Sequence, residues 1–291
     1  MTGPPASGAP DGPPAGRSPG PAGPSGGTPS EALPLGSPPH GSPPQALVLD
    51  TDGVLLDSAV VHAAAWKTAF DACLGRAGPG AAGRQAPFDP DTDYRRYVDG
   101  KARYEGAEAF LTARGLRLPP GSPDDPPGCA TVWAVAARKE AAFQDALAAA
   151  PVVPFPDVAA ALGALRSLGV PCVAVSASRH ARALIDSAGL SGLLTSVVDG
   201  TDATRLGLAG KPDPALFLHA AGVLGTTPGA AAVVEDALAG VRAGHRGGFG
   251  LVVGIDRTPD GHVTAPLREA GADLVVPDLT TLVRRVWRVA G

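Results

Sequence analysis

The chain has 291 residues, a formal net charge of −4 and a hydrophobic content of 44%, which is enough for one large domain or two modest ones with a buried core. Its Lys and Arg residues are scattered rather than clustered, and this argues against a nucleic-acid partner. No run of about 18 apolar residues predicts a membrane span.

The first segment, residues 1–44, has a composition unlike the rest of the chain. It contains 14 of the prolines and 10 of the glycines, mixed mainly with Ser and Ala. Such a segment cannot bury enough apolar surface to offset the entropy lost on ordering, so we predict a disordered tail. It lacks the apolar stretch of a secretory signal peptide, and its single arginine, Arg17, disfavours a transit peptide.

The cysteines are few, odd in number and far apart, and none forms a CxxC pair; they are Cys73, Cys129 and Cys172. This pattern is more typical of a reduced cytoplasm than of a disulfide framework. We therefore expect a cytoplasmic protein, most simply a monomer, with no membrane or nucleic-acid partner.

From residue 45 onward, short apolar runs alternate with helical patterns. The runs predict strands at 46–49, 171–175, 231–234, 250–253 and 272–276. Helices are predicted at 157–168, 179–189, 213–224 and 236–244. This alternation indicates the α/β class, with a Rossmann-like parallel sheet as the core and helices on both of its faces.

One long segment breaks this alternation. Residues 61–149 contain helical patterns, such as His62 to Cys73, 106–114 and 132–149, but no comparable strand. We therefore predict a core domain made of residues 45–60 and 150–291, and an inserted all-helical cap domain made of residues 61–149. A helical cap that follows the first strand is placed to act as a lid over the strand ends.

Polar side chains follow several predicted strands, and open α/β sheets bind ligands outside the carboxyl ends of their strands. The residues concerned are Asp50, Asp52, Ser176, Glu235 and Asp236, with Lys211 in the turn before a helix. Singly, each has a structural explanation as a helix cap, a turn residue or a solvated lysine. Their joint occurrence at strand ends, in this order, favours a shared site.

Four carboxylates in one crevice repel each other unless cations are present. Lys211 supplies one positive charge, and Mg²⁺ suits a site of a few carboxylates that also takes a substrate phosphate. A calcium loop is excluded, because its sixth and twelfth positions require Gly and Glu and are here Leu55 and Val61. The set is suited to holding a phosphoryl group in line with an aspartate oxygen.

Together these residues resemble the haloacid dehalogenase superfamily over residues 45 to about 255. Its four motifs are matched by Asp50-Thr51-Asp52-Gly53-Val54, Ser176, Lys211 and Glu235-Asp236. The resemblance implies catalytic roles for Asp50, Asp52, Ser176 and Lys211, with Asp50 as the nucleophile and Asp52 as the general acid and base. It also implies a Mg²⁺ site formed by Asp50, Asp52 through its backbone carbonyl, Asp236 and Glu235.

The helical segment resembles the β-phosphoglucomutase subfamily more closely. The matching positions, which the resemblance implies bind substrate, are His62, Trp66, Gly100, Arg103, Lys139, Ser178 and Arg179. Arg103 would grip the distal phosphate of a sugar bisphosphate, since its guanidinium forms a bidentate fork. Two positions depart from the subfamily pattern, because Glu140 and His180 stand where an amide is expected.

The expected function is magnesium-dependent phosphoryl transfer on a sugar phosphate through an aspartyl-phosphate, converting β-glucose 1-phosphate to glucose 6-phosphate. A phosphatase acting on small sugar phosphates is the alternative, because it shares Asp50, Asp52, Ser176 and Lys211 and differs only in the group that dephosphorylates Asp50. A third hypothesis is an inactive sugar-phosphate sensor, against which the complete acidic set argues.

Overall fold

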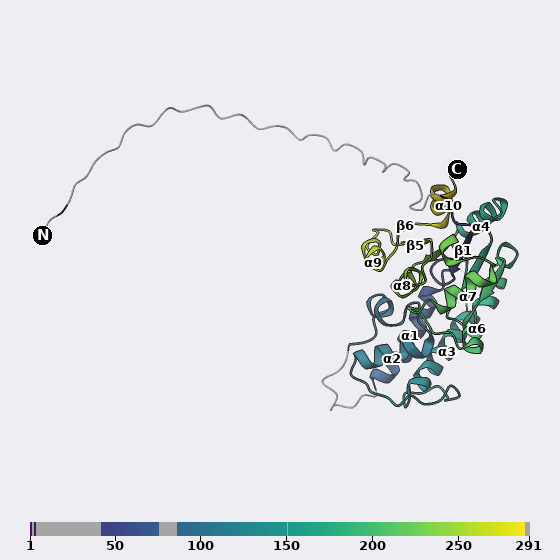
Figure 1. Cartoon of the computed structure of the whole chain (residues 1–291). Helices are drawn as coiled ribbons and strands as arrows, with labels where there is room; N and C mark the ends of the chain where they lie inside the picture. Colours follow the sequence, from purple (N-terminus) through teal and green to yellow (C-terminus); the bar gives the residue numbers. More distant parts are fainter. Residues whose placement is uncertain (2, 4–41, 76–85, 150, 289–291) are drawn as a thin grey trace, which may run out of the picture. The chain divides into compact units, whose positions relative to one another are not determined.

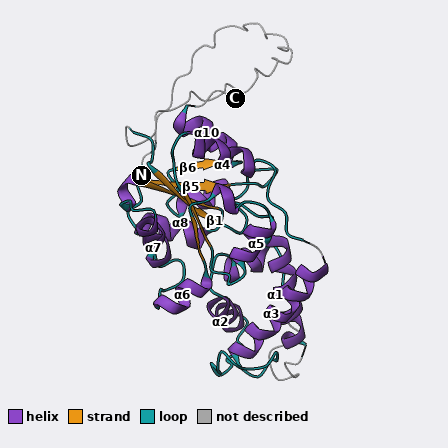
Figure 2. Cartoon of the chain, turned by 90° about the vertical axis from the view of Figure 1, so that its right-hand side faces the viewer, coloured by secondary structure: helices purple, strands orange, loops and turns teal. Residues whose placement is uncertain are grey.

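A six-stranded parallel sheet forms the centre of the fold in the computed structural model, which describes residues 1, 3, 42–75, 86–149 and 151–288. The strands are β1 (Ala46–Asp50), β2 (Cys172–Val175), β3 (Ser196–Val198), β4 (Ala231–Glu235), β5 (Leu251–Ile255) and β6 (Leu274–Val276). They are arranged in the order β3-β2-β1-β4-β5-β6, which places β1 between β2 and β4. Figures 1 and 2 label β1, β5 and β6 of this sheet. The predicted tail, residues 1–44, lies almost entirely outside the described residues.

Helices cover both faces of this sheet. They are α4 (Val158–Ser167), α5 (Ala181–Ser187), α6 (Gly200–Leu206), α7 (Ala215–Val223), α8 (Leu238–Arg246), α9 (Thr264–Glu269) and α10 (Leu279–Trp287), with short 3₁₀ turns at Ser191–Leu193 and Pro228–Ala230. Successive residues of a strand point to opposite faces. Leu47 accordingly packs in one apolar cluster with α4, α5 and α10, and Val48 in another with α7, α8 and α9. The predicted α/β architecture is therefore confirmed.

All five predicted strands and the four predicted core helices are present, but the sequence analysis missed several short elements. The missed strand, β3, has only three residues, begins at Ser196 and lies at the sheet edge, so its first two residues are only partly buried. Such a strand lacks the continuous apolar run by which central parallel strands are recognised. The helices α6, α9 and α10 were missed as well.

Between β1 and α4 the chain forms a helical insertion. It consists of α1 (Ala59–Leu74), a π-helical turn η1 (Tyr94–Val98), α2 (Arg103–Ala113) and α3 (Val132–Ala149). No strand occurs in its described residues, 59–75 and 86–149. An apolar cluster of its own includes Trp66, Phe70 and Phe110. The exact division into a core and a separate cap domain stays a prediction.

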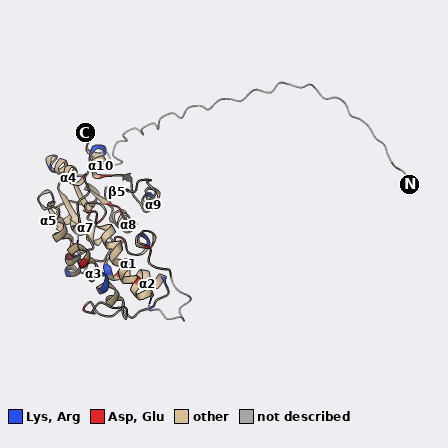
Figure 3. Cartoon of the chain, turned by 180° about the vertical axis from the view of Figure 1, so that it is seen from behind, with Lys and Arg blue, Asp and Glu red and all other residues tan. Residues whose placement is uncertain are grey.

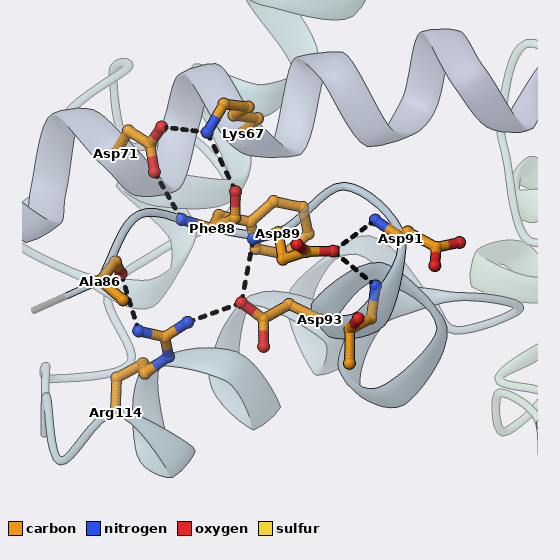
Figure 4. Close-up of polar contacts among 9 residues, drawn as sticks. Lys67, Asp71, Ala86, Phe88, Asp89, Asp91, Asp93 and Arg114 are labelled. Carbon is orange, nitrogen blue, oxygen red and sulfur yellow. Dashed lines mark hydrogen bonds and ion pairs between the residues drawn. The ribbon is translucent and has the colours of Figure 1, made fainter.

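Polar contacts tie the segment that follows α1 to its neighbouring helices (Figure 4). The backbone N–H of Phe88 donates to Asp71 Oδ1 at 2.7 Å, and Lys67 Nζ donates to the Phe88 carbonyl at 3.0 Å. Further along, Arg114 on α2 donates to Asp93 Oδ2 at 2.6 Å. These contacts anchor the stretch that leads through η1 to the loop before α2.

A disulfide joins Cys73, near the end of α1, to Cys129 in the loop before α3, with a Cα–Cα distance of 5.3 Å. The expectation that the cysteines do not form a disulfide framework is wrong for this pair. The two residues are 56 positions apart, and only the packing of α1 beside α3 brings them together, which sequence spacing does not reveal. Cys172 is free and buried, and burial raises the pKa of its thiol to about 12.

We expect replacement of Cys73 and Cys129 by serine to lower the free energy of unfolding by roughly 2–4 kcal/mol, because the unfolded chain gains entropy when a loop of this length is opened. Urea unfolding of the variant and of the natural chain measures the difference. Thiol titration of the unreduced, unfolded natural chain should find Cys172 as its one reactive thiol, and three reactive thiols would contradict the disulfide.

No helix among the described residues is long and apolar enough to cross a membrane.

Candidate active site

The carboxyl ends of β1, β2 and β4 open into a cavity of about 510 Å³ that the helical insertion also lines. From the core it receives Asp50, Asp52, Ser178, Lys211 and Asp236. From the insertion it receives His62, Trp66, Gly100, Arg103 and Lys139. The structure thus brings most of the predicted site residues to one cavity. Ser176 and Glu235 are fully buried next to this lining. Ser176 donates a hydrogen bond to Asp52, and Glu235 accepts one from Lys211.

Lys211 joins two of the carboxylates. Its side chain is 1% exposed, and Nζ donates to Asp50 Oδ1 and, at 2.5 Å, to Glu235 Oε1. Burial by itself lowers the pKa of Lys211, but the two carboxylates outweigh that effect and raise it. Lys211 is therefore a buried ammonium beside Asp50, and it could equally neutralise a phosphate held there. The interpretation as a solvated lysine is excluded.

Asp50, Glu235 and Asp236 form a candidate metal site, since one carboxylate oxygen from each lies within 4.8 Å of the other two. Burial raises the pKa of Asp50 and of Asp236, and the neighbouring acids raise both further. Asp50 and Glu235 are buried and Asp236 is partly buried, and carboxylate oxygens that repel one another in this way fit a hard cation such as Mg²⁺. Asp52 Oδ1 and Oδ2 instead accept hydrogen bonds from Ser58 and Ser176, so a contribution of Asp52 to the metal site through its backbone carbonyl stays a prediction.

Two glycines leave room for these acids. Gly53 has a φ of +81°, and a Cβ there would lie 1.8 Å from Asp236 Oδ2. At Gly240 in α8, a Cβ would lie 1.7 Å from Glu235 Oε1. Any larger side chain at either position would displace an acid, so the tight turn after Asp52 and the close approach of α8 are both required by the acidic site.

The surroundings of Asp52 lower its pKa, whereas those of Asp50 raise the pKa of that residue. Ser176 Oγ donates to its Oδ2 at 3.0 Å, Ser58 donates to its Oδ1, and His62 Nε2 lies 3.4 Å from the same Oδ1. Burial alone would raise the pKa of Asp52, but His62 and the two hydroxyls hold it well below its usual range. Neighbouring carboxyl groups whose pKa values are pushed apart are typical of an acid–base site.

His62 lies between Asp52 and Lys139. Lys139 Nζ is 2.9 Å from His62 Nδ1, and the imidazole stacks on Phe143 with 4.1 Å between ring centroids. Burial lowers the pKa of Lys139 to about 8, which leaves it mainly charged at neutral pH. Because an ammonium only donates, we infer that Nδ1 accepts and that the imidazole proton resides on Nε2, facing Asp52.

Trp66 is 4% exposed and stacks on Phe70 at 4.8 Å within the core of the insertion. It also lines the cavity, so its packing role is clear and substrate contact stays a prediction.

The loop before α2 packs directly on the segment that follows β4. Gly100 has a φ of +68°, and a Cβ there would lie 3.1 Å from the Ala237 side chain, directly after the Glu235-Asp236 pair. Arg103, at the start of α2, forms an ion pair with Glu140. After β2, Ser178 Oγ accepts from the backbone N–H of His180 at 3.2 Å, and Arg179 donates to Thr204 Oγ1 at 3.4 Å.

Many residues that line the cavity were missing from the predicted site, among them Tyr94, Asp99, Glu140 and His180. Burial and the charge of Glu235 raise the pKa of Asp99 to about 7, which shows that the insertion adds a further acid near the candidate metal site. Asp99 follows no strand, so the strand-end rule could not find it. Glu140 and His180 could have been found from the sequence, because both stand where the subfamily pattern has an amide.

Comparisons with known proteins agree with this geometry. Residues 44–248 match the family model of the haloacid dehalogenase-like hydrolases. The chain is 42% identical over 239 residues to a β-phosphoglucomutase of Mycobacterium tuberculosis, covering 82% of this chain and 91% of that protein. A haloacid dehalogenase family hydrolase from Deinococcus radiodurans, solved with bound phosphate and sodium, is 27% identical with a TM-score of 0.58, covering 85% of this chain and 96% of the other.

A β-phosphoglucomutase-like structure from Bacteroides vulgatus has a TM-score of 0.65 at 21% identity, covers 84% of this chain and 88% of its own, and supports the fold alone. The family match spans most of the described chain and includes every strand-end residue of the cavity. The chain therefore belongs to the haloacid dehalogenase-like hydrolases, and within them to the β-phosphoglucomutase-like branch.

Proposed function

We propose that this enzyme transfers a phosphoryl group within a sugar phosphate through an aspartyl-phosphate at Asp50, converting β-glucose 1-phosphate to glucose 6-phosphate with Mg²⁺. The observation that carries the proposal is the placement of Asp50 in the cavity, in contact with the Lys211 ammonium and with a carboxylate oxygen within 4.8 Å of Glu235 and of Asp236. The 42% identity to a protein named β-phosphoglucomutase supports the choice of substrate.

In the proposed reaction, the phosphoryl group travels between Asp50 and a sugar hydroxyl. The ionised Asp52 accepts the proton of the hydroxyl that attacks the aspartyl-phosphate, the bond between phosphorus and Asp50 breaks, and a bisphosphate forms. In the return step Asp50 attacks the other phosphate, and Asp52 gives its proton to the leaving sugar oxygen. Lys211 neutralises the phosphate oxygens throughout.

Mg²⁺, when bound by Asp50, Asp236 and Glu235, supplies further positive charge that stabilises the phosphoryl group in transfer. Ser176, expected to donate to that phosphate, donates to Asp52 in this structure. Turning its hydroxyl toward a bound phosphate is part of the proposal.

We expect Mg²⁺ to raise the melting temperature of the chain, and to do so more at pH 8 than at pH 5. The pKa values of Asp50 and Asp236 are raised in the folded state, so without metal the fold loses stability as the pH rises above their ordinary value near 3.8. Mg²⁺ binds the ionised carboxylates and competes with protons. Differential scanning fluorimetry with and without Mg²⁺ measures this, and an equal shift for the Asp236→Asn variant would contradict the assignment.

The second candidate function is a phosphatase of small sugar phosphates, in which water instead of a sugar hydroxyl attacks the aspartyl-phosphate. One observation favours it: Arg103, the proposed ligand of the distal phosphate, is already paired with Glu140. Phosphorus NMR of the enzyme with β-glucose 1-phosphate, Mg²⁺ and a trace of glucose 1,6-bisphosphate separates the two. Glucose 6-phosphate is the expected product, and free phosphate would establish the phosphatase.

We also propose a monomer that acts on small molecules, with no nucleic-acid or membrane partner. A cytoplasmic location was expected because the cysteines suggested no disulfide framework, and the Cys73–Cys129 disulfide removes that support. The basic residues support the absence of a nucleic-acid partner, because they are spread over many elements of the described chain and form no continuous stripe (Figure 3). Size-exclusion chromatography with light scattering tests the monomer, and a stable dimer would overturn it.

A further inference from the structure

Glu140 connects the insertion to the core at the cavity. Its carboxylate pairs with Arg103 at the start of α2 through Oε2, and with His180 in the loop after β2 through Oε1. Gln144, one turn further along α3, donates to Oε1 at 2.9 Å. Arg103 and Glu140 belong to the insertion and His180 to the core, so this one carboxylate bridges the two parts. Basic and acidic stretches accordingly lie close together around α3 (Figure 3).

The surroundings of Glu140 are rich in positive charge. Arg103, Lys139, Arg179 and His180 line the same cavity. Arg179 is close enough to Arg103 to lower the pKa of its guanidinium, an effect secondary to burial. Burial alone would raise the pKa of Glu140, but His180 and Arg103 lower it to about 2. Glu140 is therefore an anion at neutral pH, and it lies beside the cations Arg103, Lys139 and Arg179, which would otherwise attract an anion from solution.

The side chains of Arg103, Glu140 and His180 are 26%, 24% and 29% exposed. A ligand in the cavity can thus reach them, and the ion pairs are not locked inside an apolar core. An external anion that binds at Arg103 must displace the Glu140 carboxylate. Its binding is therefore weakened by the free energy of the contacts that Glu140 loses with Arg103 and His180.

We propose that Glu140 occupies the phosphate position at Arg103 as a competing internal anion and is displaced by the distal phosphate of the substrate. The inference rests on the proposed function, which requires a second phosphate site. The proposed reaction passes through a bisphosphate, which must turn so that its other phosphate faces Asp50. Because the Glu140 carboxylate competes for Arg103, the bisphosphate binds less tightly. The bisphosphate can therefore dissociate, turn and bind again.

Glu140→Gln tests this proposal, because glutamine keeps the shape but loses the charge, and it replaces one of the two acceptor oxygens with an NH2 group that cannot accept from Arg103. Asp145→Asn is the matched control, since Asp145 is an exposed acid on the same helix and outside the cavity lining. We would titrate sulfate, an unreactive divalent anion, into the full-length, Mg²⁺-loaded protein by calorimetry. Glu140→Gln should bind sulfate about tenfold more tightly, and Asp145→Asn should bind it as the natural chain does.

Adding Arg103→Gln to Glu140→Gln should abolish this gain, which assigns it to the Arg103 subsite and not to Lys211. Steady-state kinetics give a second readout: Glu140→Gln should lower KM for the phosphate ester that is turned over, without raising kcat. Unchanged or weaker sulfate binding by Glu140→Gln, or a raised KM, would show that Glu140 only supports the structure and would overturn the proposal. Failure of the natural chain to turn over any sugar phosphate would instead refute the proposed function, while the sulfate titration would still decide the role of Glu140.

Discussion

Replacement of Asp50 by asparagine is expected to lower turnover of phosphate esters by about 10⁴-fold or more, the effect typical of removing a covalent nucleophile. The amide is nearly isosteric with the carboxylate, but its oxygen does not form an aspartyl-phosphate. The phosphate site should survive, because Lys211 keeps its contact with Glu235. Radioactive phosphate transfer to the protein, followed after acid quenching, measures the intermediate directly and should be absent in the variant.

The matched control for Asp50 is Asp57→Asn, which removes an exposed acid seven positions further along the chain and should leave turnover unchanged. Circular dichroism of both variants shows whether each is folded. If a folded Asp50→Asn protein kept activity within about a factor of ten of the natural chain, the barrier would have changed by less than about 1.4 kcal/mol. Asp50 would then not be the nucleophile, and the whole assignment of the strand ends would fail.

The strand ends were predictable because one rule of sheet geometry connects sequence to site. Asp50 and Glu235 terminate apolar runs whose residues are buried on both faces, and parallel strands deliver their carboxyl ends to one edge. The rule needs no side-chain detail, so it located the acids before their contacts were known. Lys211 follows no strand, and it was identified instead from the turn before a helix in which it lies and from the family motif that it matches.

The residues that the sequence did not predict depend on how separate elements pack. Asp99 approaches the acids only because its loop seats Gly100 against Ala237. Cys73 meets Cys129 only because α1 packs beside α3. Glu140 and His180 were visible as departures from a pattern, but their pairing through a single carboxylate is a contact between insertion and core, and no spacing along the chain encodes it.

Replacement of Lys211 by methionine is expected to lower the free energy of unfolding by roughly 3–5 kcal/mol at neutral pH in the absence of metal, because two buried carboxylates lose their shared cation. The same change should reduce turnover severely, since the phosphate beside Asp50 loses its neutralising charge. Lys67→Met is the control, because its ion pair with Asp71 is partly exposed and should contribute no more than about 1 kcal/mol. Urea unfolding measures all three chains.

The pH dependence of the Lys211→Met effect distinguishes lost charge from lost packing. Without the ammonium, which lowers the pKa of Asp50, that carboxyl group favours its protonated form in the folded state more strongly. A carboxyl group with a raised folded pKa makes the fold less stable as the pH rises above its ordinary value near 3.8. The deficit should therefore be small near pH 4 and largest at pH 8, and Mg²⁺ should reduce it at pH 8 by supplying positive charge to the same acids. The ring centroid of Phe217 lies 4.8 Å from Lys211 Nζ, so the aliphatic part of the lysine side chain also packs there. A stability deficit that does not change with pH would mean that Lys211 stabilises the fold through this packing. The buried acids would then not depend on its charge.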